Sequence, residues 1–499
     1  MEALAGIETA LQWHVLIFIL LGTAVGLMLG AMPGLDATTG VALLLPVTYV
    51  LAPIQALLFF VSMYAAGVFA GSITAILFRI PGSSEAIMTA IEGHQFTVRG
   101  EASKALSVAV ICSVIGGLIA TVALFTLTPV LASIALEFGP AEYFALGLLG
   151  LSCIAAVSAD NPIKGALAAL IGLLLATVGI DQITGVKRFD FGFTSILGGI
   201  PFVPAMIGLF AASEVYRRIV QRDLVLVSEV TGSGARFKLP ELKTLKKLRW
   251  TVLRSSLLGL FVGILPGAGA TTAAILAYSA EVRLNRDKTG WGRGRIEGVA
   301  APESANNAAA IGAMIPLLSL GIPGSATTAV LIGAFLIHNL QPGPFLFLNN
   351  PDIAYALFGG IAITNLVVLL LSVIFIPLFA RLVRLPYPLL ATSILTVSVI
   401  GSLTFGDVNS VVVMLAFAVL GLVFEAADYP LAPVVLGMVL GPIVETSLRR
   451  ALLMEGMNLT AVVARPLAGT LLLLAIAFLL APLAAMLWKT FAGKYKANR

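Results

Sequence analysis

The sequence predicts an all-α fold: a polytopic transmembrane helical protein with two repeats, expected to be inverted, and with helices broken at Pro-Gly. Composition is the first observation, since 59% of the 499 residues are hydrophobic and 11% are charged, whereas soluble domains carry about 25% charged residues. The second is a series of long apolar windows, because a bilayer crossing needs about 20 apolar residues. The stretch from Leu11 to Phe78, for example, has Asp36 as its one charged residue. The third is an internal repeat.

The apolar windows predict helices in order along the chain, separated by short polar or Pro/Gly-rich segments. In the first half they lie near residues 11–32, 54–79, 105–128, 141–158, 162–179 and 194–216. A basic, polar linker follows from about Gln221 to Arg249. In the second half helices are expected near 252–265, 268–284, 299–316, 325–340, 353–381, 388–404, 409–427, 430–446 and 467–488.

The repeat is visible in two matched motifs. Residues 26–39 and 259–272 share the pattern G-L-x-x-G-x-x-P-G-x-x-A-T-T, and residues 80–83 and 322–325 both read I-P-G-S. The chain therefore divides into a first membrane repeat (1–220), a basic cytoplasmic linker (221–250), a second membrane repeat (251–452) and a closing transmembrane helix with a basic cytoplasmic tail (453–499).

Basic residues indicate the orientation. The first 78 residues contain no Lys or Arg, whereas both gather at 217–254, at 283–295 and at the C-terminus. The positive-inside tendency then places the N-terminus in the periplasm and the C-terminus in the cytoplasm of a bacterial inner-membrane protein, and disfavours a nucleic-acid partner. Because the second repeat would begin on the inside, the repeats are expected to be inverted. Arg449 and Arg450 argue against inversion, since it would leave them outside.

Each repeat carries two Pro-Gly breaks. Proline and glycine end helices, and a helix end at membrane depth survives only where it is buried or lines a wet cavity. Free N–H groups at such an end suit a carboxylate, and carbonyls and hydroxyls suit a cation. Ordinary proline kinks are the alternative, but two matched pairs favour a substrate-binding site. Its candidate residues are Pro33, Gly34, Thr38, Thr39, Pro81, Gly82, Ser83, Pro266, Gly267, Thr271, Thr272, Pro323, Gly324 and Ser325.

A second polar cluster contains Glu303, Asn306 and Asn307, expected at the mouth of an apolar helix. Such residues are expensive in lipid and indicate function. Both amides are candidates for binding the substrate carboxylate, and all three residues, with Thr272, are candidates for the coupling ion, a sodium ion or a proton. The alternative is a helix cap made by Ser304 or Asn306. No cofactor is expected, and no metal beyond sodium.

These motifs resemble the large membrane subunit of the tripartite tricarboxylate transporters, the TctA family. The resemblance spans nearly the whole chain and rests on residues 259–278, 297–308, 315–325 and 433–452, with 71–77, 80–82 and 89–93 in the first repeat. Two departures are Phe69-Ala70-Gly71-Ser72, where the family commonly has Tyr-Gly-Gly-Ser, and Glu92-Gly93, where Asp-Gly is usual.

The resemblance implies import of tricarboxylates or related organic acids, driven by a sodium or proton gradient. It also implies two partners, a small membrane subunit of about four helices and a periplasmic solute-binding protein that delivers the carboxylate. The expected function is therefore a secondary active transporter subunit in contact with membrane lipids, and not an enzyme. An ion or solute channel is the first alternative. An intramembrane enzyme is the second, with Asp160 and Asp407 as its one candidate pair.

Overall fold

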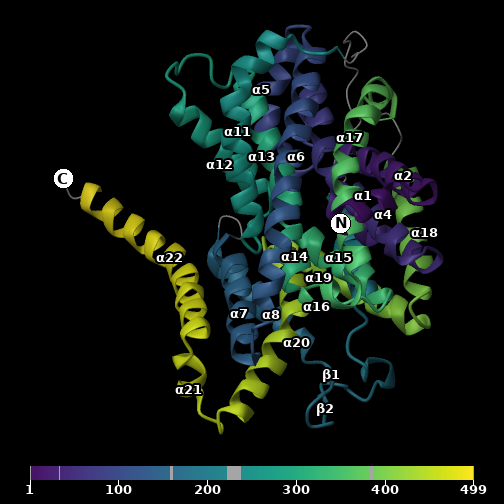
Figure 1. Cartoon of the computed structure of the whole chain (residues 1–499), viewed down its shortest axis with the longest axis vertical. Coiled ribbons are helices and arrows are strands. Elements are labelled where there is room, and N and C mark those ends of the chain that lie inside the picture. Colours follow the sequence, from purple (N-terminus) through teal and green to yellow (C-terminus); the bar gives the residue numbers. More distant parts are fainter. Residues whose placement is uncertain (1, 33, 158–160, 222–237, 383–386, 498–499) are drawn as a thin grey trace. The chain divides into compact units, whose positions relative to one another are not determined.

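The structure is a computed structural model that describes residues 2–32, 34–157, 161–221, 238–382 and 387–497. Helices make up most of this part of the chain (Figure 1). Its strands are β1 (Gly179–Ile180) and β2 (Lys187–Arg188), which pair antiparallel with Gly179 opposite Arg188. The all-α prediction is therefore confirmed.

The first half contains α-helices interrupted by short 3-10 and π segments. In order they are α1 (Glu2–Leu11), α2 (Trp13–Ala31), α3 (Ala37–Leu44), η1 (Leu45–Val50), α4 (Pro53–Phe78), η2 (Ser84–Ala86), α5 (Ile87–Val98), α6 (Ala102–Ala135), α7 (Pro140–Val157), α8 (Pro162–Ala176), η3 (Thr194–Ile196), α9 (Phe202–Met206), η4 (Ile207–Ala212) and α10 (Ser213–Gln221).

The second half is helical throughout its described residues. In order its helices are α11 (Leu242–Ile264), α12 (Gly269–Leu284), α13 (Glu297–Gly312), α14 (Met314–Leu320), α15 (Ala326–Ile337), α16 (Pro344–Asn349), α17 (Pro351–Leu382), α18 (Tyr387–Leu403), α19 (Val408–Ala426), α20 (Leu431–Met454), α21 (Leu459–Ala464) and α22 (Pro466–Ala497).

Six of the described helices are long and apolar enough to cross a membrane: Trp13–Ala31, Pro53–Phe78, Ala102–Ala135, Pro351–Leu378, Val408–Ala426 and Leu431–Met454. Shorter apolar helices accompany them, among them Pro162–Ala176 and Ala326–Ile337. A helix satisfies its own backbone hydrogen bonds, which is what the interior of a bilayer requires. The chain is a multi-pass membrane protein.

Besides helices that extend past their expected bounds, such as α6 to Ala135 and α20 to Met454, three predicted elements differ from the structure. The helix expected at 194–216 begins at Phe202, because the preceding residues include Gly192 and Gly199 with φ of +83° and +94° and form turns. The helix expected at 299–316 is divided at Ala313 into α13 and α14. The segment expected as a linker ends inside α11, which begins at Leu242, and its residues 222–237 lie outside the described residues.

Contacts divide the chain into two compact units. Unit 1 contains residues 1–132, 202–264 and 269–422, and unit 2 contains residues 133–201, 265–268 and 423–499. Both units draw on both halves of the sequence. The division of the chain into a first repeat (1–220), a linker (221–250), a second repeat (251–452) and a closing segment (453–499) stays a prediction.

In unit 1, α2 packs closely against α4, and α11 against α13. The contacts depend on glycines of the repeated motif: a Cβ on Gly30 would lie 2.3 Å from the Gly67 carbonyl oxygen, and one on Gly263 would lie 2.3 Å from that of Ala309. No side chain fits at such a distance. The matched motifs therefore make the same kind of backbone-to-backbone contact in each half, and the second contact positions α13.

In unit 2, α20 packs against α7 and α8, and α22 packs against α7. The hairpin of β1 and β2 is tied to α20 by ion pairs: Arg188 contacts Glu445 at 2.5 Å, and Arg449 contacts Asp181 at 2.5 Å. The backbone N–H of Ile183 and the Arg449 guanidinium hold the pKa of the Asp181 carboxyl well below its usual range. This carboxyl therefore stays ionised at any physiological pH.

Candidate functional site

The four Pro-Gly motifs are ends of helices and not kinks within them. They lie between α2 and α3, between α4 and η2, between α11 and α12, and between α14 and α15. Pro33 itself lies outside the described residues. Pro266 and Gly267 lie in the turn 265–268, where Gly267 has φ of +81°. The predicted breaks are confirmed, and their role in binding substrate stays a prediction.

Two of the helices that follow a break are capped by the protein's own side chains. Asp36 caps α3 by accepting a hydrogen bond from the Thr39 N–H at 2.8 Å. Ser325 caps α15 in a capping box, where its hydroxyl accepts from the Thr328 N–H at 3.2 Å. Ser83, before η2, makes no such cap bond. The N–H groups at the start of α3 and α15 are therefore partly occupied already.

The second break of each half is packed against backbone. A Cβ on Gly82 would lie 2.4 Å from the Gly30 carbonyl oxygen and 2.8 Å from the Gly71 Cα atom. A Cβ on Gly324 would lie 2.8 Å from the Ala313 Cα atom. Pro81 and Pro323 each precede one of these glycines. Only glycine fits at these two positions, and the Pro-Gly sequence is required by packing as well as by the turn.

Hydroxyl pairs join the breaks of one half to those of the other. The Thr38 and Thr327 hydroxyls lie 2.8 Å apart in a buried contact. The Ser84 and Thr271 hydroxyls lie 2.8 Å apart in an exposed one. In both pairs a residue after the first break of one half meets a residue after the second break of the other half. Thr272, next to Thr271, is partly buried.

Two further residues lie at these breaks. The Tyr64 hydroxyl of α4 lies 3.2 Å from the Ser325 hydroxyl. A Cβ on Gly34 would collide with the Arg218 guanidinium, which lies directly against this glycine and is bonded to Glu214. Neither Tyr64 nor Arg218 is predicted as a site residue from the sequence, because their contacts join residues far apart in the chain.

The polar cluster predicted in the second half lies within a helix and not at its mouth. Because α13 begins at Glu297, the segment 303–307 is in its interior, and neither Ser304 nor Asn306 caps it. The Ser304 hydroxyl instead donates to the Ala300 carbonyl at 2.8 Å. Every residue of α13 is buried. The capping alternative is wrong, and so is the placement at the start of the helix.

Glu303 is fully buried, with an exposed fraction of 0%. Its Oε1 atom accepts hydrogen bonds from the Ser72 hydroxyl of α4 and from the Thr89 hydroxyl of α5, the latter at 2.5 Å. Its Oε2 atom has no hydrogen bond. Asn306, also at 0% exposure, lies beside this carboxyl group, and neither of its amide atoms makes a hydrogen bond of normal geometry.

Asn307 faces a different helix. Its Nδ2 donates to the Ser113 carbonyl of α6 at 2.8 Å and lies 3.4 Å from the Asn365 Oδ1 of α17, while its own Oδ1 is unpaired. The Asn365 amide in turn lies 3.4 Å from the Thr121 hydroxyl. Three amides (Asn306, Asn307 and Asn365) and the Glu303 carboxyl group thus occupy the core of unit 1, where unpaired polar atoms are costly and indicate a ligand or a functional role.

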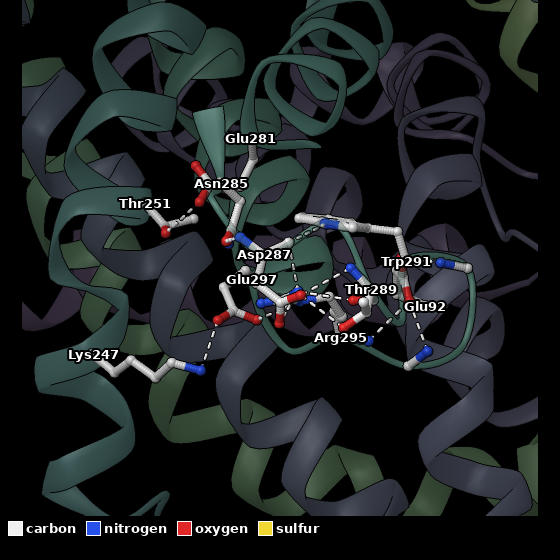
Figure 2. Close-up of polar contacts among 12 residues, drawn as sticks. Glu92, Lys247, Thr251, Glu281, Asn285, Asp287, Thr289, Trp291, Arg295 and Glu297 are labelled. Carbon is white, nitrogen blue, oxygen red and sulfur yellow. Dashed lines mark hydrogen bonds and ion pairs between the residues drawn. The ribbon is translucent and has the colours of Figure 1, made fainter. Parts of the chain in front are cut away.

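A second buried carboxylate, Glu92 of α5, fixes the segment before α13 (Figure 2). It accepts hydrogen bonds from the N–H groups of Gly292, Gly294 and Arg295 at 2.6, 2.7 and 2.9 Å. The Tyr278 hydroxyl adds a fourth at 3.0 Å. Since Thr89 lies one turn before Glu92 on α5, this contact holds Thr89 in place against α13.

Figure 2 also shows the ion pairs around the same segment. Glu297 is paired with Lys247 at 2.8 Å and with Arg295 at 3.5 Å. The described residues contain no group of three or more His, Cys, Asp or Glu side chains arranged to hold a metal ion. Of the pair considered for an intramembrane enzyme, Asp160 lies outside the described residues, and Asp407 bonds Asn409 at the start of α19.

The fold defines a class, the multi-pass α-helical membrane proteins with broken helices and with polar groups buried in their core. Residues 16–436 match the tripartite tricarboxylate transporter TctA family, and the chain belongs to that family. It is therefore a subunit of the tricarboxylate transporter type, in a system that works with partner subunits.

Two relatives come from Agrobacterium vitis. The chain is 35% identical over 476 residues to the uncharacterized 52.8 kDa protein in the TAR-I ttuC' 3' region, covering 95% of this chain and 94% of the relative. It is 37% identical over 218 residues to the uncharacterized protein in the TAR-II ttuC' 3' region, covering 43% of this chain and 89% of the relative. No solved structure matches the chain.

Proposed function

We propose that the chain is the translocating subunit of a secondary active transporter that imports tricarboxylates or related organic acids across the bacterial inner membrane. Family membership supports the substrate class. The observation that carries the proposal is the exposed Ser84–Thr271 hydroxyl pair, where helix breaks of the two halves meet. The equivalent Thr38–Thr327 pair is buried. The exposed pair offers a substrate access to helix ends inside the membrane protein.

The substrate carboxylate binds at the exposed pair. Thr271 lies in the first turn of α12, where the backbone N–H groups favour an anion. Carboxyl groups lie nearby: Glu85, next to Ser84, is within electrostatic range of Asp36 and of Glu303. Because an anion cannot enter such surroundings alone, sodium ions or protons are transported with it, driven by their gradient.

Partners complete the transporter. A periplasmic solute-binding protein delivers the carboxylate, and a small membrane subunit accompanies this chain in the lipid bilayer. The N-terminus lies in the periplasm and the C-terminus in the cytoplasm. Movement of one bundle of helices against another then opens the site to the inside, as in other transporters with broken helices.

The proposal is tested by uptake of labelled citrate and related carboxylates into proteoliposomes, with both partner proteins present and a sodium or proton gradient imposed. Removal of the exposed pair in Ser84→Ala and Thr271→Val is expected to lower the rate of uptake by about tenfold, equivalent to about 1.4 kcal/mol. Thr126→Val is the matched control, since the Thr126 hydroxyl is exposed and bonds to carbonyls of its own helix.

Two outcomes contradict the proposal. Flux that needs neither a gradient nor the binding protein would identify a channel. Absence of uptake for every carboxylate offered, with the protein folded and both partners bound, would exclude this substrate class.

A further inference from the structure

One carboxyl oxygen of Glu303 accepts hydrogen bonds and the other has none. Both hydroxyl donors, Ser72 and Thr89, reach its Oε1 atom, while Oε2 is buried without a hydrogen bond. Asn306 lies beside it with both amide atoms unpaired and 0% of the residue exposed. A buried carboxyl oxygen without a partner is costly, and a proton on Oε2 would satisfy it by a hydrogen bond to the amide oxygen of Asn306.

Ionisable groups on the elements around α13 do not neutralise Glu303. Glu85 of η2 and the Cys112 thiol of α6 are close enough to act on it, and neither carries a positive charge. On α4, the Tyr64 hydroxyl bonds Ser325. On α5, Glu92 is bonded to backbone N–H groups of 292–295 and to Tyr278 of α12.

The basic groups near α13 are paired elsewhere. Arg254 of α11 is bonded to Glu281 of α12, and Lys247 of α11 to Glu297 at the start of α13. In the described part of the chain no Lys or Arg forms a salt bridge with Glu303. An ionised carboxylate buried in this way costs several kcal/mol, whereas the neutral acid does not carry that penalty.

We propose that Glu303 carries the coupling proton, an inference that rests on the proposed transport function. The carboxyl group takes a proton from water on the side where substrate enters, forming the O–H bond at Oε2, which donates to the Asn306 Oδ1 atom. After the helices move, this O–H bond breaks, and the proton passes to water on the other side. The Ser72 and Thr89 hydroxyls keep Oε1 as the acceptor, so the proton is held at Oε2.

The first test is infrared difference spectroscopy, in which the spectrum of Glu303→Gln is subtracted from that of the wild type. Each full chain is reconstituted with its partners and measured without substrate. The wild type is expected to show the carbonyl band of a protonated carboxylic acid that shifts in deuterium oxide and is lost in Glu303→Gln. Glu281→Gln is the matched control, because Glu281 is also a buried carboxyl group but is bonded to Thr251 and Arg254. It is expected to leave the band in place.

The second test is transport. With the membrane potential clamped, one pH unit supports about tenfold accumulation for each coupled proton. The wild type is expected to reach such accumulation, and Glu303→Gln, which resembles the protonated acid, is expected to accumulate nothing while still exchanging substrate across the membrane. Exchange serves as the check that the variant is folded and binds substrate.

Three results overturn the proposal. The first is a wild type without the carbonyl band. The second is a Glu303→Gln variant that accumulates substrate to the wild-type level. The third is sodium-dependent accumulation with a sodium-induced rise in Tm that is lost in Glu303→Gln, which would make the site a sodium site. If the proposed transport function itself is wrong, neither accumulation nor exchange would be seen in the wild type or in any variant. The infrared band would still show whether Glu303 carries a proton.

Discussion

Glycine at position 263 sets how closely α11 approaches α13, and α13 carries Glu303. A Cβ at this position would lie 2.3 Å from the Ala309 carbonyl oxygen, which is backbone and cannot turn away. Gly263→Ala is therefore expected to push the two helices apart and to destabilise the protein by about 1–3 kcal/mol. The measurement is the Tm of the purified protein in detergent, compared with the wild type.

Gly198→Ala is the control for Gly263→Ala, because Gly198 is exposed and a Cβ there would meet no atom within 4 Å. Its Tm is expected to match the wild type. If Gly263→Ala also left the Tm unchanged, the close contact between α11 and α13 would be incorrect.

At the level of residues, the sequence revealed which polar side chains belong to the site but not which residues they contact. Glu303, Asn306 and Asn307 were recognisable because charged and amide side chains are costly in an apolar helix. Their partners Ser72 and Asn365 were not singled out as parts of the site, since a hydroxyl or a single amide in an apolar helix also satisfies itself on its own backbone. Nothing in the residue types shows that positions 72 and 303 meet in space.

Among the elements, the segment 290–296 depends on one side chain of another helix. Glu92 of α5 accepts three of its backbone N–H groups (Figure 2), and hydrogen bonds to charged groups contribute about 1.5–3 kcal/mol each. Glu92→Ala is expected to free this segment. The measurement is limited proteolysis with trypsin, where cleavage after Arg293 and Arg295 should become at least about tenfold faster as the opening free energy falls.

Glu101→Ala serves for comparison, because Glu101 is an exposed acid that pairs with Lys104 at 3.9 Å. Trypsin should cut this variant at the wild-type rate. If Glu92→Ala were cleaved as slowly as the wild type, the segment would be held by other contacts, such as the pair of Arg295 with Glu297.

Helix positions followed from apolar windows and Pro-Gly breaks, and the ends of α2, α4 and α12 fell within a few residues of expectation. The errors have physical causes. Apolar composition alone cannot separate a helix from a turn-rich stretch, and 194–201 contains the apolar residues Ile196, Leu197 and Ile200 although the helix begins at Phe202. The division of the 299–316 helix at Ala313 has a signal that the apolar window hides, since Pro316 has no N–H to donate to the Gly312 carbonyl and lies in the first turn of α14.

For the whole molecule, the sequence predicted a multi-pass membrane protein because its composition excludes a soluble fold. The two compact units could not be predicted from the sequence, since unit 1 and unit 2 each combine segments from both halves. The orientation of the chain in the membrane is still predicted from the distribution of its basic residues alone. Arg449, which argued against inverted repeats, is paired with Asp181 and Glu445, so its position is fixed by contacts with the protein's own acids.

The orientation is testable by labelling single cysteines. Cys112 and Cys153 are buried, and replacing both with alanine gives a background without thiols. Glu8→Cys reports on the N-terminal helix, which has no basic residue near it, and Thr289→Cys reports on the basic segment 283–295; both positions are exposed. A membrane-impermeant maleimide added to intact spheroplasts should label Glu8→Cys and spare Thr289→Cys, because basic loops remain in the cytoplasm. Inside-out vesicles should show the reverse, and the same labelling side for both positions would contradict the predicted placement of the two halves.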